Sequence, residues 1–261
     1  MTTRAPALFV GHGSPMNAIE DTPSAIYWAR LGRTLAGAKP RAIVVVSAHW
    51  VTDGVRVMSN AQPRTIHDFG RSFPQALFDV EYPAPGDPDL ANTIVETLRP
   101  FVAQLDDSWG LDHGAWSVLL RLFPDADVPV VQVSLDARRS PAEHYAIGRA
   151  LSALRDDNVL LLGSGNIVHN LRAFFHAESP DPEQWVHDFN AEIVMALQNN
   201  HQKVIDYQKL PDAAIAAPDW EHFAPVLYVL GAQRENEAPV MFNSYASPGI
   251  TMHSFALGVG A

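Results

Sequence analysis

The stretch Ala42-Ile-Val-Val-Val-Ser-Ala-His-Trp50 decides the fold class. It begins with a short β-rich run, which lies between a segment of helical period at about Pro23–Ala36 and another at about Asp87–Gln104. The alternation of such runs with helical segments is the signature of βαβ units in a mostly parallel sheet. The sequence therefore predicts an α/β fold in which helices cover both faces of a mostly parallel central sheet.

The same alternation continues along the chain. We expect strands at Ala7–Val10, Ala42–Ser47, Val55–Met58, Val128–Ser134, Val159–Gly163 and Thr251–Leu257. We expect helices at about Pro23–Ala36, Asp87–Gln104, Ala115–Phe123, Pro141–Arg155, Pro182–Asn199 and His222–Leu230. Pro141 and Pro182 suit a first helical turn, because Ser140 and Asp181 precede them as N-cap residues. No repeat or linker divides the chain, so we expect one domain over residues 1–261.

The composition excludes several classes of function. The chain of 261 residues has 18 Lys and Arg against 29 Asp and Glu, which gives a net charge of −11, and it has 11 His and no Cys. A negative charge repels phosphate backbones and anionic lipids, so we expect no nucleic-acid and no membrane partner. Without Cys, any metal must bind His, carboxylate or water. The apolar runs are too short for a signal peptide or a membrane span, which predicts a cytoplasmic protein.

The segment between Ser59 and Pro88 has little regular period but several aromatic residues. A long ordered loop inside a compact domain is more often functional than not. Within it, Tyr82-Pro-Ala-Pro-Gly-Asp-Pro88 is rich in Pro and Gly but short. We interpret this part as a rigid loop, and not as a domain boundary.

Three histidines lie at the ends of predicted strands. His12 follows the first strand, His49 follows the second, and His169 lies just beyond the strand Val159–Gly163. The carboxyl ends of parallel strands open on one crevice, so we expect a common centre there. A lone histidine is more often a hydrogen-bonded structural residue, but three at equivalent strand ends favour a shared metal site. Imidazole ligands without thiolates favour non-haem Fe(II) or Zn(II).

The sequence leaves two neighbouring residues as alternatives for the remaining metal ligand. His222, at the start of the last predicted helix, could complete the site. Glu221 could do so equally, because two histidines and one carboxylate are the commoner pattern for non-haem iron. His113 lies in a polar turn before a helix, where an imidazole can act as a general acid or base or simply as a polar residue of the helix start.

Other motif interpretations fail on spacing. Ser164 lacks the upstream glycine of the Gly-x-Ser-x-Gly nucleophile elbow, because Leu162 stands at that position. Gly163-Ser-Gly165 follows a strand but lacks the further residues of a phosphate-binding loop. We interpret these glycines as permitting a tight turn that places His169.

A set of motifs runs in order over nearly the whole chain. They are Pro6-Ala-Leu-Phe-Val-Gly-His-Gly-Ser-Pro-Met16, Val44-Val-Val-Ser-Ala-His-Trp50, Ile66-His-Asp-Phe69 with Phe73-Pro-Gln-Ala-Leu-Phe78, Tyr82-Pro-Ala-Pro-Gly86, Asp112-His-Gly-Ala-Trp116, Ser164-Gly-Asn-Ile-Val-His-Asn170 and Glu221-His222. The ordered set resembles the LigB-like class III extradiol ring-cleavage dioxygenases, specifically the 4,5-DOPA dioxygenase extradiol type. Gly-His-Gly-Ser alone is also similar to sirohydrochlorin-type chelatases, so the order of the motifs carries the resemblance.

The resemblance implies a single catalytic domain that inserts O2 into a DOPA-like or related catechol and yields a muconate semialdehyde. It implies that His12, His49 and His222 bind the metal, with Fe(II) for activity or Zn(II) at the same site. It further implies that His169 and His113 are the acid/base pair, and that His169 lies close enough to serve as a fourth ligand. The sequence departs from the family at Ala217-Pro-Asp-Trp220, which puts the identity of the substrate in question.

Four aromatic side chains near these motifs are candidates for the substrate pocket. We expect Phe69, Trp50 and Trp116 to give the substrate ring an apolar wall, although aromatic residues more often pack in a core. His67 would line the same pocket, or would hydrogen-bond Asp68.

Two rival functions are a zinc-dependent hydrolase and a tetrapyrrole chelatase-like metal-binding protein. Oxygen uptake distinguishes the hydrolase, because hydrolysis consumes no O2.

Overall fold

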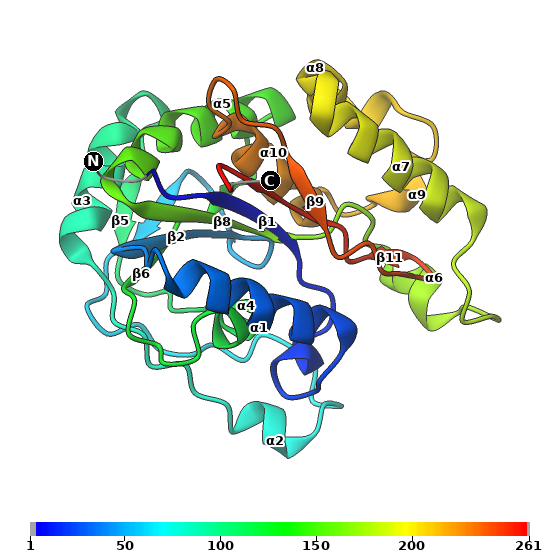
Figure 1. Ribbon diagram of the computed structural model, residues 1–261, viewed down its shortest axis with the longest axis horizontal. Helices are drawn as coiled ribbons and strands as arrows, with labels where there is room; N and C mark the ends of the chain where they lie inside the picture. The colour runs from blue at the N-terminus through cyan, green and yellow to red at the C-terminus, as the bar shows by residue number, and fades with distance from the viewer. Residues whose placement is uncertain (1–3, 260–261) are drawn as a thin grey trace.

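The computed structural model describes residues 4–259, and within them six strands form the central sheet in the order β6-β2-β8-β1-β12-β9 (Figure 1). The strands are β1 (Ala7–Gly11), β2 (Ala42–Ser47), β6 (Val130–Gln132), β8 (Val159–Gly165), β9 (Val240–Phe242) and β12 (Ser254–Leu257). β6, β2, β8 and β1 are parallel to one another, whereas β12 pairs antiparallel with both β1 and β9. The prediction of a mostly parallel central sheet is confirmed.

Further strands pair outside this sheet. They are β3 (Val51–Thr52) with β7 (Leu135–Asp136), β4 (Arg56–Met58) with β5 (Gln104–Asp106), and β10 (Ala246–Ser247) with β11 (Ile250–Thr251). The α-helices are α1 (Pro23–Ala36), α2 (Gln75–Phe78), α3 (Pro88–Thr97), α4 (His113–Leu122), α5 (Pro141–Leu151), α6 (Leu171–Phe175), α7 (Gln184–Asn199), α8 (His201–Ile205), α9 (Ala213–Ala216) and α10 (Trp220–Gly231). Short 3₁₀ helices are η1 (Pro15–Ala18), η2 (Arg99–Phe101), η3 (Ser152–Asp157) and η4 (Tyr207–Lys209). None of the helices in residues 4–259 combines the length and the apolar character needed to cross a bilayer.

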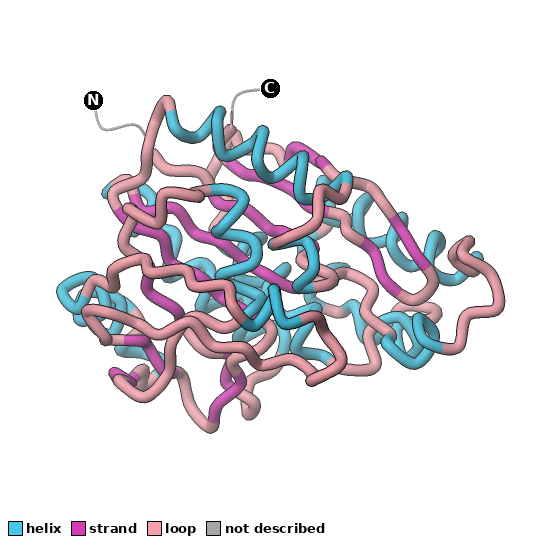
Figure 2. Tube along the Cα trace, turned by 90° about the horizontal axis from the view of Figure 1, so that it is seen from below, coloured by secondary structure: helices cyan, strands magenta, loops and turns pink. Residues whose placement is uncertain are grey.

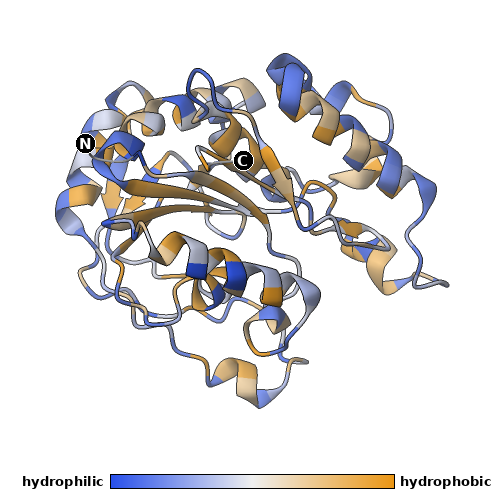
Figure 3. Cartoon of the chain, viewed as in Figure 1, coloured by the Kyte–Doolittle hydropathy of each residue, from blue (hydrophilic) through white to orange (hydrophobic). Residues whose placement is uncertain are grey.

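The sheet lies between two layers of helices. α1 and α4 cover one face, and α5 and α10 cover the other (Figure 1). Figure 2 shows from below that long loops also run across the strands. Successive strand residues alternate between the faces: Phe9 and Val44 pack on the α10 side, and Leu8 and Val45 pack on the α1 side. Both faces of the strands are therefore apolar, as the hydropathy colours of Figure 3 show, and helices on both faces are confirmed.

Two predicted helices begin at a proline that follows a capping side chain. The hydroxyl of Thr22 accepts a hydrogen bond from the backbone at the start of α1, and Ser140 forms a reciprocal capping box with Glu143 at the start of α5. These contacts satisfy backbone N–H groups that have no partner within the helix. The corresponding prediction for Pro182 is wrong, because α7 begins at Gln184 and has no side-chain cap.

Other predicted boundaries differ from the structure. The helix expected at Asp87–Gln104 ends at Thr97, and after Val102, whose φ is 56°, the chain forms β5 instead. A left-handed residue cannot continue a right-handed helix, so it ends the helical run. The strand expected at Thr251–Leu257 is divided into β11 and β12, and the strand expected at Val128–Ser134 is confined to the shorter β6.

The loop between β4 and α3 is fixed by buried contacts. Tyr82 is buried, and its hydroxyl donates a hydrogen bond to the carbonyl oxygen of Phe123 at 3.0 Å. The backbone N–H of Tyr82 donates to the hydroxyl of Thr65 at 2.9 Å. This part of the chain is therefore held against the α4 side of the sheet, where it brings Asp68 and Phe69 to the carboxyl ends of the strands.

Candidate active site

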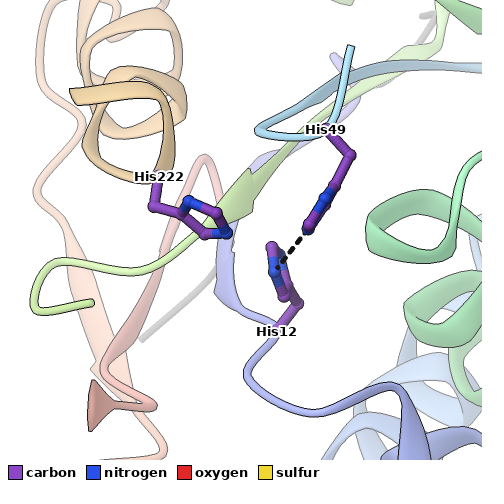
Figure 4. Close-up of side chains that lie close together, drawn as sticks. All are labelled: His12, His49 and His222. Carbon is purple, nitrogen blue, oxygen red and sulfur yellow. Dashed lines mark hydrogen bonds between the residues drawn. The ribbon is translucent and has the colours of Figure 1, made fainter. Parts of the chain in front are cut away.

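The parallel strands bring three of the predicted histidines to one edge of the sheet. His12 directly follows β1, His49 follows β2, and His169 follows β8, while His222 lies in the first turn of α10. β1 and β2 both flank β8, so their carboxyl ends adjoin one another. Figure 4 shows the rings of His12, His49 and His222 turned toward a common point.

The ring nitrogens of these histidines face one another. His12 Nε2 and His49 Nε2 lie 3.2 Å apart, and one nitrogen from each of His12, His49 and His222 lies within 4.8 Å of the other two. Two nitrogens that bind one tetrahedral ion at about 2.1 Å lie roughly 3.4 Å apart. The pair of His12 and His49 has about this spacing, and His222 lies close enough to both that the three could hold one metal ion. Glu221 is outside this set, with its Oε1 3.8 Å from His222 Nδ1.

Burial keeps these imidazoles neutral. It lowers the pKa of His12 and of His222 well below the ordinary value for histidine, because a buried imidazole resists protonation. It lowers the pKa of His49 to about 3, and the neighbouring His113 adds to this effect. At neutral pH each ring therefore has one nitrogen without a hydrogen, which is the state that binds a metal.

Ser164 selects which nitrogen of His12 is free. The Ser164 hydroxyl lies 2.9 Å from His12 Nδ1 and donates its own hydrogen to the carbonyl oxygen of Gly114 at 2.5 Å. Since this hydroxyl has only one hydrogen, it accepts the N–H of His12 Nδ1. The lone pair of His12 Nε2 then points toward His49. Ser164, which the sequence excludes as a nucleophile, is a candidate for orienting a metal ligand.

A Ser164→Ala variant should bind metal roughly 10–100-fold more weakly, because the ring of His12 loses the partner that fixes its orientation. Competition against a chelator measures this change. Ser117→Ala is a matched control, because Ser117 is equally buried and its hydroxyl has no hydrogen-bond partner in residues 4–259. Unchanged affinity in Ser164→Ala would contradict this role.

Two further buried histidines border the cluster. The ring of His169 stacks on that of His222, with centroids 3.5 Å apart and planes inclined by 4°. Burial lowers the pKa of His169 to about 4, and its Nδ1 has no hydrogen-bond partner in residues 4–259. The ring of His113, at the start of α4, lies 3.9 Å from that of His49. Both rings are therefore near enough to exchange protons with a molecule bound at the cluster.

Two glycines allow elements to approach this site closely. A Cβ at Gly165 would lie 2.2 Å from the carbonyl oxygen of His222, so only glycine lets α10 pack there against β8. A Cβ at Gly114 would lie 2.9 Å from the ring of His49. The predicted tight turn at Gly163-Ser-Gly165 is wrong, because β8 continues through Gly165 and these glycines serve helix packing instead.

Asp112 fixes the start of α4, and sequence reasoning did not assign it a role. Its carboxylate accepts hydrogen bonds from Ser47 Oγ at 2.6 Å, from Gln132 Nε2 at 2.8 Å and from the backbone of Ala115 at 3.1 Å. Polar side chains that are fully buried need such partners. The network holds the adjacent His113 in place, and the signal in the sequence was an Asp at the N-cap position of a predicted helix.

An aromatic cluster extends from the site along the β4–α3 loop. The ring centroid of Phe69 lies 5.6 Å from that of His113, and His67 lies 5.8 Å from Phe69 and 5.6 Å from Trp116. His67 Nε2 is 2.9 Å from the carbonyl oxygen of Val80, so its polar contact is not with Asp68. The structure thus brings Phe69 directly beside the catalytic candidates, with Trp116 and His67 behind it.

Two tryptophans lie elsewhere. Trp50 stacks on Trp109, with ring centroids 5.6 Å apart and planes inclined by 2°, in the core on the α4 side of the sheet. Trp220 stacks on His144 at 5.3 Å in a small cleft between α5 and α10. Neither indole is among the aromatic partners of the histidine cluster in residues 4–259.

Comparison with known proteins identifies the family. The model for the catalytic LigB subunit of aromatic ring-opening dioxygenase matches residues 6–258. The chain is 48% identical over 237 residues to the 4,5-DOPA dioxygenase extradiol of Escherichia coli K12, covering 88% of this chain and 86% of that protein. It is 38% identical over 244 residues to the 4,5-DOPA dioxygenase extradiol of Beta vulgaris, covering 91% and 90%.

The likeness extends to a solved structure. A crystal structure of an uncharacterised Escherichia coli K12 protein superposes with a TM-score of 0.84 at 40% identity, covering 97% of this chain and 99% of that one. Fold, motif order and sequence identity therefore agree over nearly the whole chain. The chain belongs to the LigB family and is an extradiol aromatic ring-opening dioxygenase.

Proposed function

We propose that this protein uses O2 to cleave the ring of a catechol beside its two hydroxyl groups and releases a muconate semialdehyde. The observation that carries the proposal is the cluster of His12, His49 and His222, which two further buried histidines border. The similar proteins named 4,5-DOPA dioxygenase extradiol support a DOPA-like substrate. We further propose that residues 1–261 form one catalytic domain, of which residues 1–3 and 260–261 lie outside the described structure.

The three clustered histidines fit a divalent metal ion. All three are neutral nitrogen donors, and the buried Nδ1 of His222 has no hydrogen-bond partner in residues 4–259. His12, His49 and His222 would hold Fe(II), and Zn(II) suits the same donors as a redox-inert substitute. Bound there, Fe(II) would supply the open coordination positions and the redox chemistry that O2 insertion needs.

His169 and His113 would handle the protons of the reaction. His169 is neutral and has a free buried nitrogen, so it can accept a proton from a catechol hydroxyl. His113 lies on the other side of the cluster, and its Nδ1 is 3.0 Å from a carboxylate oxygen of Asp68. In this position it can hold a proton and donate it to oxygen as the ring opens.

The aromatic residues of the β4–α3 loop would bind the ring of the substrate. Phe69 lies edge-on to His113, so its ring offers an apolar wall next to the acid. Trp116 and His67 would support this wall from behind. Trp50, which is the neighbour of His49 in the chain, would contribute by fixing the turn after β2, since its carbonyl oxygen accepts a hydrogen bond from Leu135 at 2.8 Å.

Oxygen uptake tests this proposal. Protein reconstituted with Fe(II) without air should consume O2 when it is given L-DOPA, caffeate or protocatechuate, and it should form a yellow semialdehyde product. The relative rates would rank the substrates. Protein loaded with Zn(II) is the control and should consume none, because zinc has no accessible redox step. Iron-loaded protein that consumes no O2 with any catechol, or zinc-loaded protein with full activity, would overturn the proposal and favour hydrolysis.

A further inference from the structure

One carboxylate connects two of the histidines. Asp68 Oδ2 lies 3.3 Å from His49 Nδ1, and Asp68 Oδ1 lies 3.0 Å from His113 Nδ1. Asp68 Oδ1 also accepts a hydrogen bond from the backbone N–H of His113 at 2.8 Å. The side chain of Asp68 is 20% exposed, so it is largely shielded from solvent. A single side chain thus contacts a metal-ligand candidate and an acid candidate at once.

The loop around Asp68 holds the carboxylate in this place. On one side His67 contacts the carbonyl oxygen of Val80, and on the other side Phe69 packs against Phe73 at 5.3 Å and Phe78 at 5.0 Å. Both neighbours of Asp68 in the chain are therefore anchored by contacts of their own. The backbone on both sides of Asp68 is thus held within the loop, and this places the carboxylate within reach of His49 and His113.

We propose that Asp68 is a positioning residue that couples a metal ligand to the acid of the reaction, an inference that rests on the proposed function. Its Oδ2, 3.3 Å from His49 Nδ1, would keep the hydrogen of this imidazole on Nδ1, so that the lone pair of His49 Nε2 points toward His12. Through Oδ1 it accepts the backbone N–H of His113 and lies 3.0 Å from Nδ1 of the same residue, where it faces the ring. A displacement of this carboxylate would therefore disturb metal binding and proton transfer together.

A second metal ion is the alternative explanation, because one ligand atom each from His49, Asp68 and His113 could hold an ion. The geometry disfavours it. A neutral imidazole has one free lone pair, so a His49 that binds a metal through Nε2 keeps its hydrogen on Nδ1 and has no lone pair there for a second ion. Metal stoichiometry distinguishes the two explanations.

The Asp68→Asn variant tests the proposal, because it keeps the size of the side chain but loses one acceptor oxygen and the charge. At saturating Fe(II) we expect kcat to fall roughly 10–100-fold with little change in the KM for the catechol. We expect the metal affinity, measured with Zn(II) against a chelator and without substrate, to fall by a similar factor. Asp68→Glu, which restores the carboxylate, should recover part of both losses. Asp79→Asn is the control, since Asp79 is an exposed residue of the same loop whose carboxylate accepts a hydrogen bond from Gln75 Nε2 at 2.9 Å.

A double variant of Asp68→Asn with His113→Phe separates the effect of Asp68 on proton transfer from its effect on metal binding. In that background Asp68→Asn should cause no further loss of kcat, because the residue through which it acts on proton transfer is gone. It should still weaken metal binding, because His49 remains. Losses of kcat that multiply, an unchanged metal affinity in Asp68→Asn, or a fall from two bound metal ions to one would each overturn the proposal. The affinity measurement needs no turnover, so absence of dioxygenase activity would refute the proposed function and leave this test intact.

Discussion

A His113→Phe variant should keep its metal and lose about 10²–10⁴-fold in turnover, which is the usual contribution of a positioned acid or base. His113 lies outside the cluster of His12, His49 and His222, so the metal ligands remain. Phenylalanine fills the same space beside Phe69 but cannot hold a proton. The measurement is kcat from O2 uptake at saturating Fe(II) and catechol, together with the metal content of the same sample.

A solvent-exposed histidine gives the matched control. His187→Phe replaces an exposed residue of α7 by the same side chain and should leave both turnover and metal content unchanged. Near-native turnover in His113→Phe would remove this residue from the catalytic pair. Loss of metal in the same variant would assign it to the ligand set instead.

His12→Ala and His49→Ala should each abolish metal retention and, with it, activity. Each variant removes one of three nitrogens that face the same point, and two remaining imidazoles hold an ion weakly. The loss of metal affinity should exceed the roughly 10–100-fold that is typical of a residue, such as Ser164, that contacts a metal ligand and not the metal itself. Elemental analysis after dialysis against a chelator measures it.

Glu221→Gln is the decisive control for the third ligand. Glu221 lies outside the group of facing nitrogens, so this variant should retain stoichiometric metal, whereas His222→Ala should not. Full metal content in His12→Ala or His49→Ala would remove that residue from the ligand set. Metal loss in Glu221→Gln alone would restore the pattern of two histidines and one carboxylate.

The central elements of the fold could be predicted from local patterns. β2 and α1 begin and end where expected, because β2 is a continuous β-rich run and α1 begins with a proline after the cap of Thr22. The placement of His12, His49 and His169 at one edge follows from the parallel sheet. Short elements at the edge of the sheet were harder to predict: β9 has only three residues, too few for a recognisable strand pattern, and it forms by pairing with β12.

Some features of the site could not be predicted, because they depend on contacts between segments that are far apart in the sequence. Asp68 was considered only as a partner for His67, since nothing local indicates that the loop turns its carboxylate toward His49 and His113. Trp50 was expected in the apolar wall around the substrate ring, and its stacking on Trp109, many residues later, could not be read from the sequence. The same limit applies to Ser164, whose role depends on the approach of α4 to β8.

The position of the bound metal tests the account most directly. Anomalous X-ray diffraction at the iron edge, from crystals loaded with Fe(II) without air, locates each ion without reference to activity. We predict one peak per chain at about 2.1 Å from a nitrogen of each of His12, His49 and His222. A peak between His49, Asp68 and His113, a second site, or a first peak with Glu221 among its ligands would contradict the account.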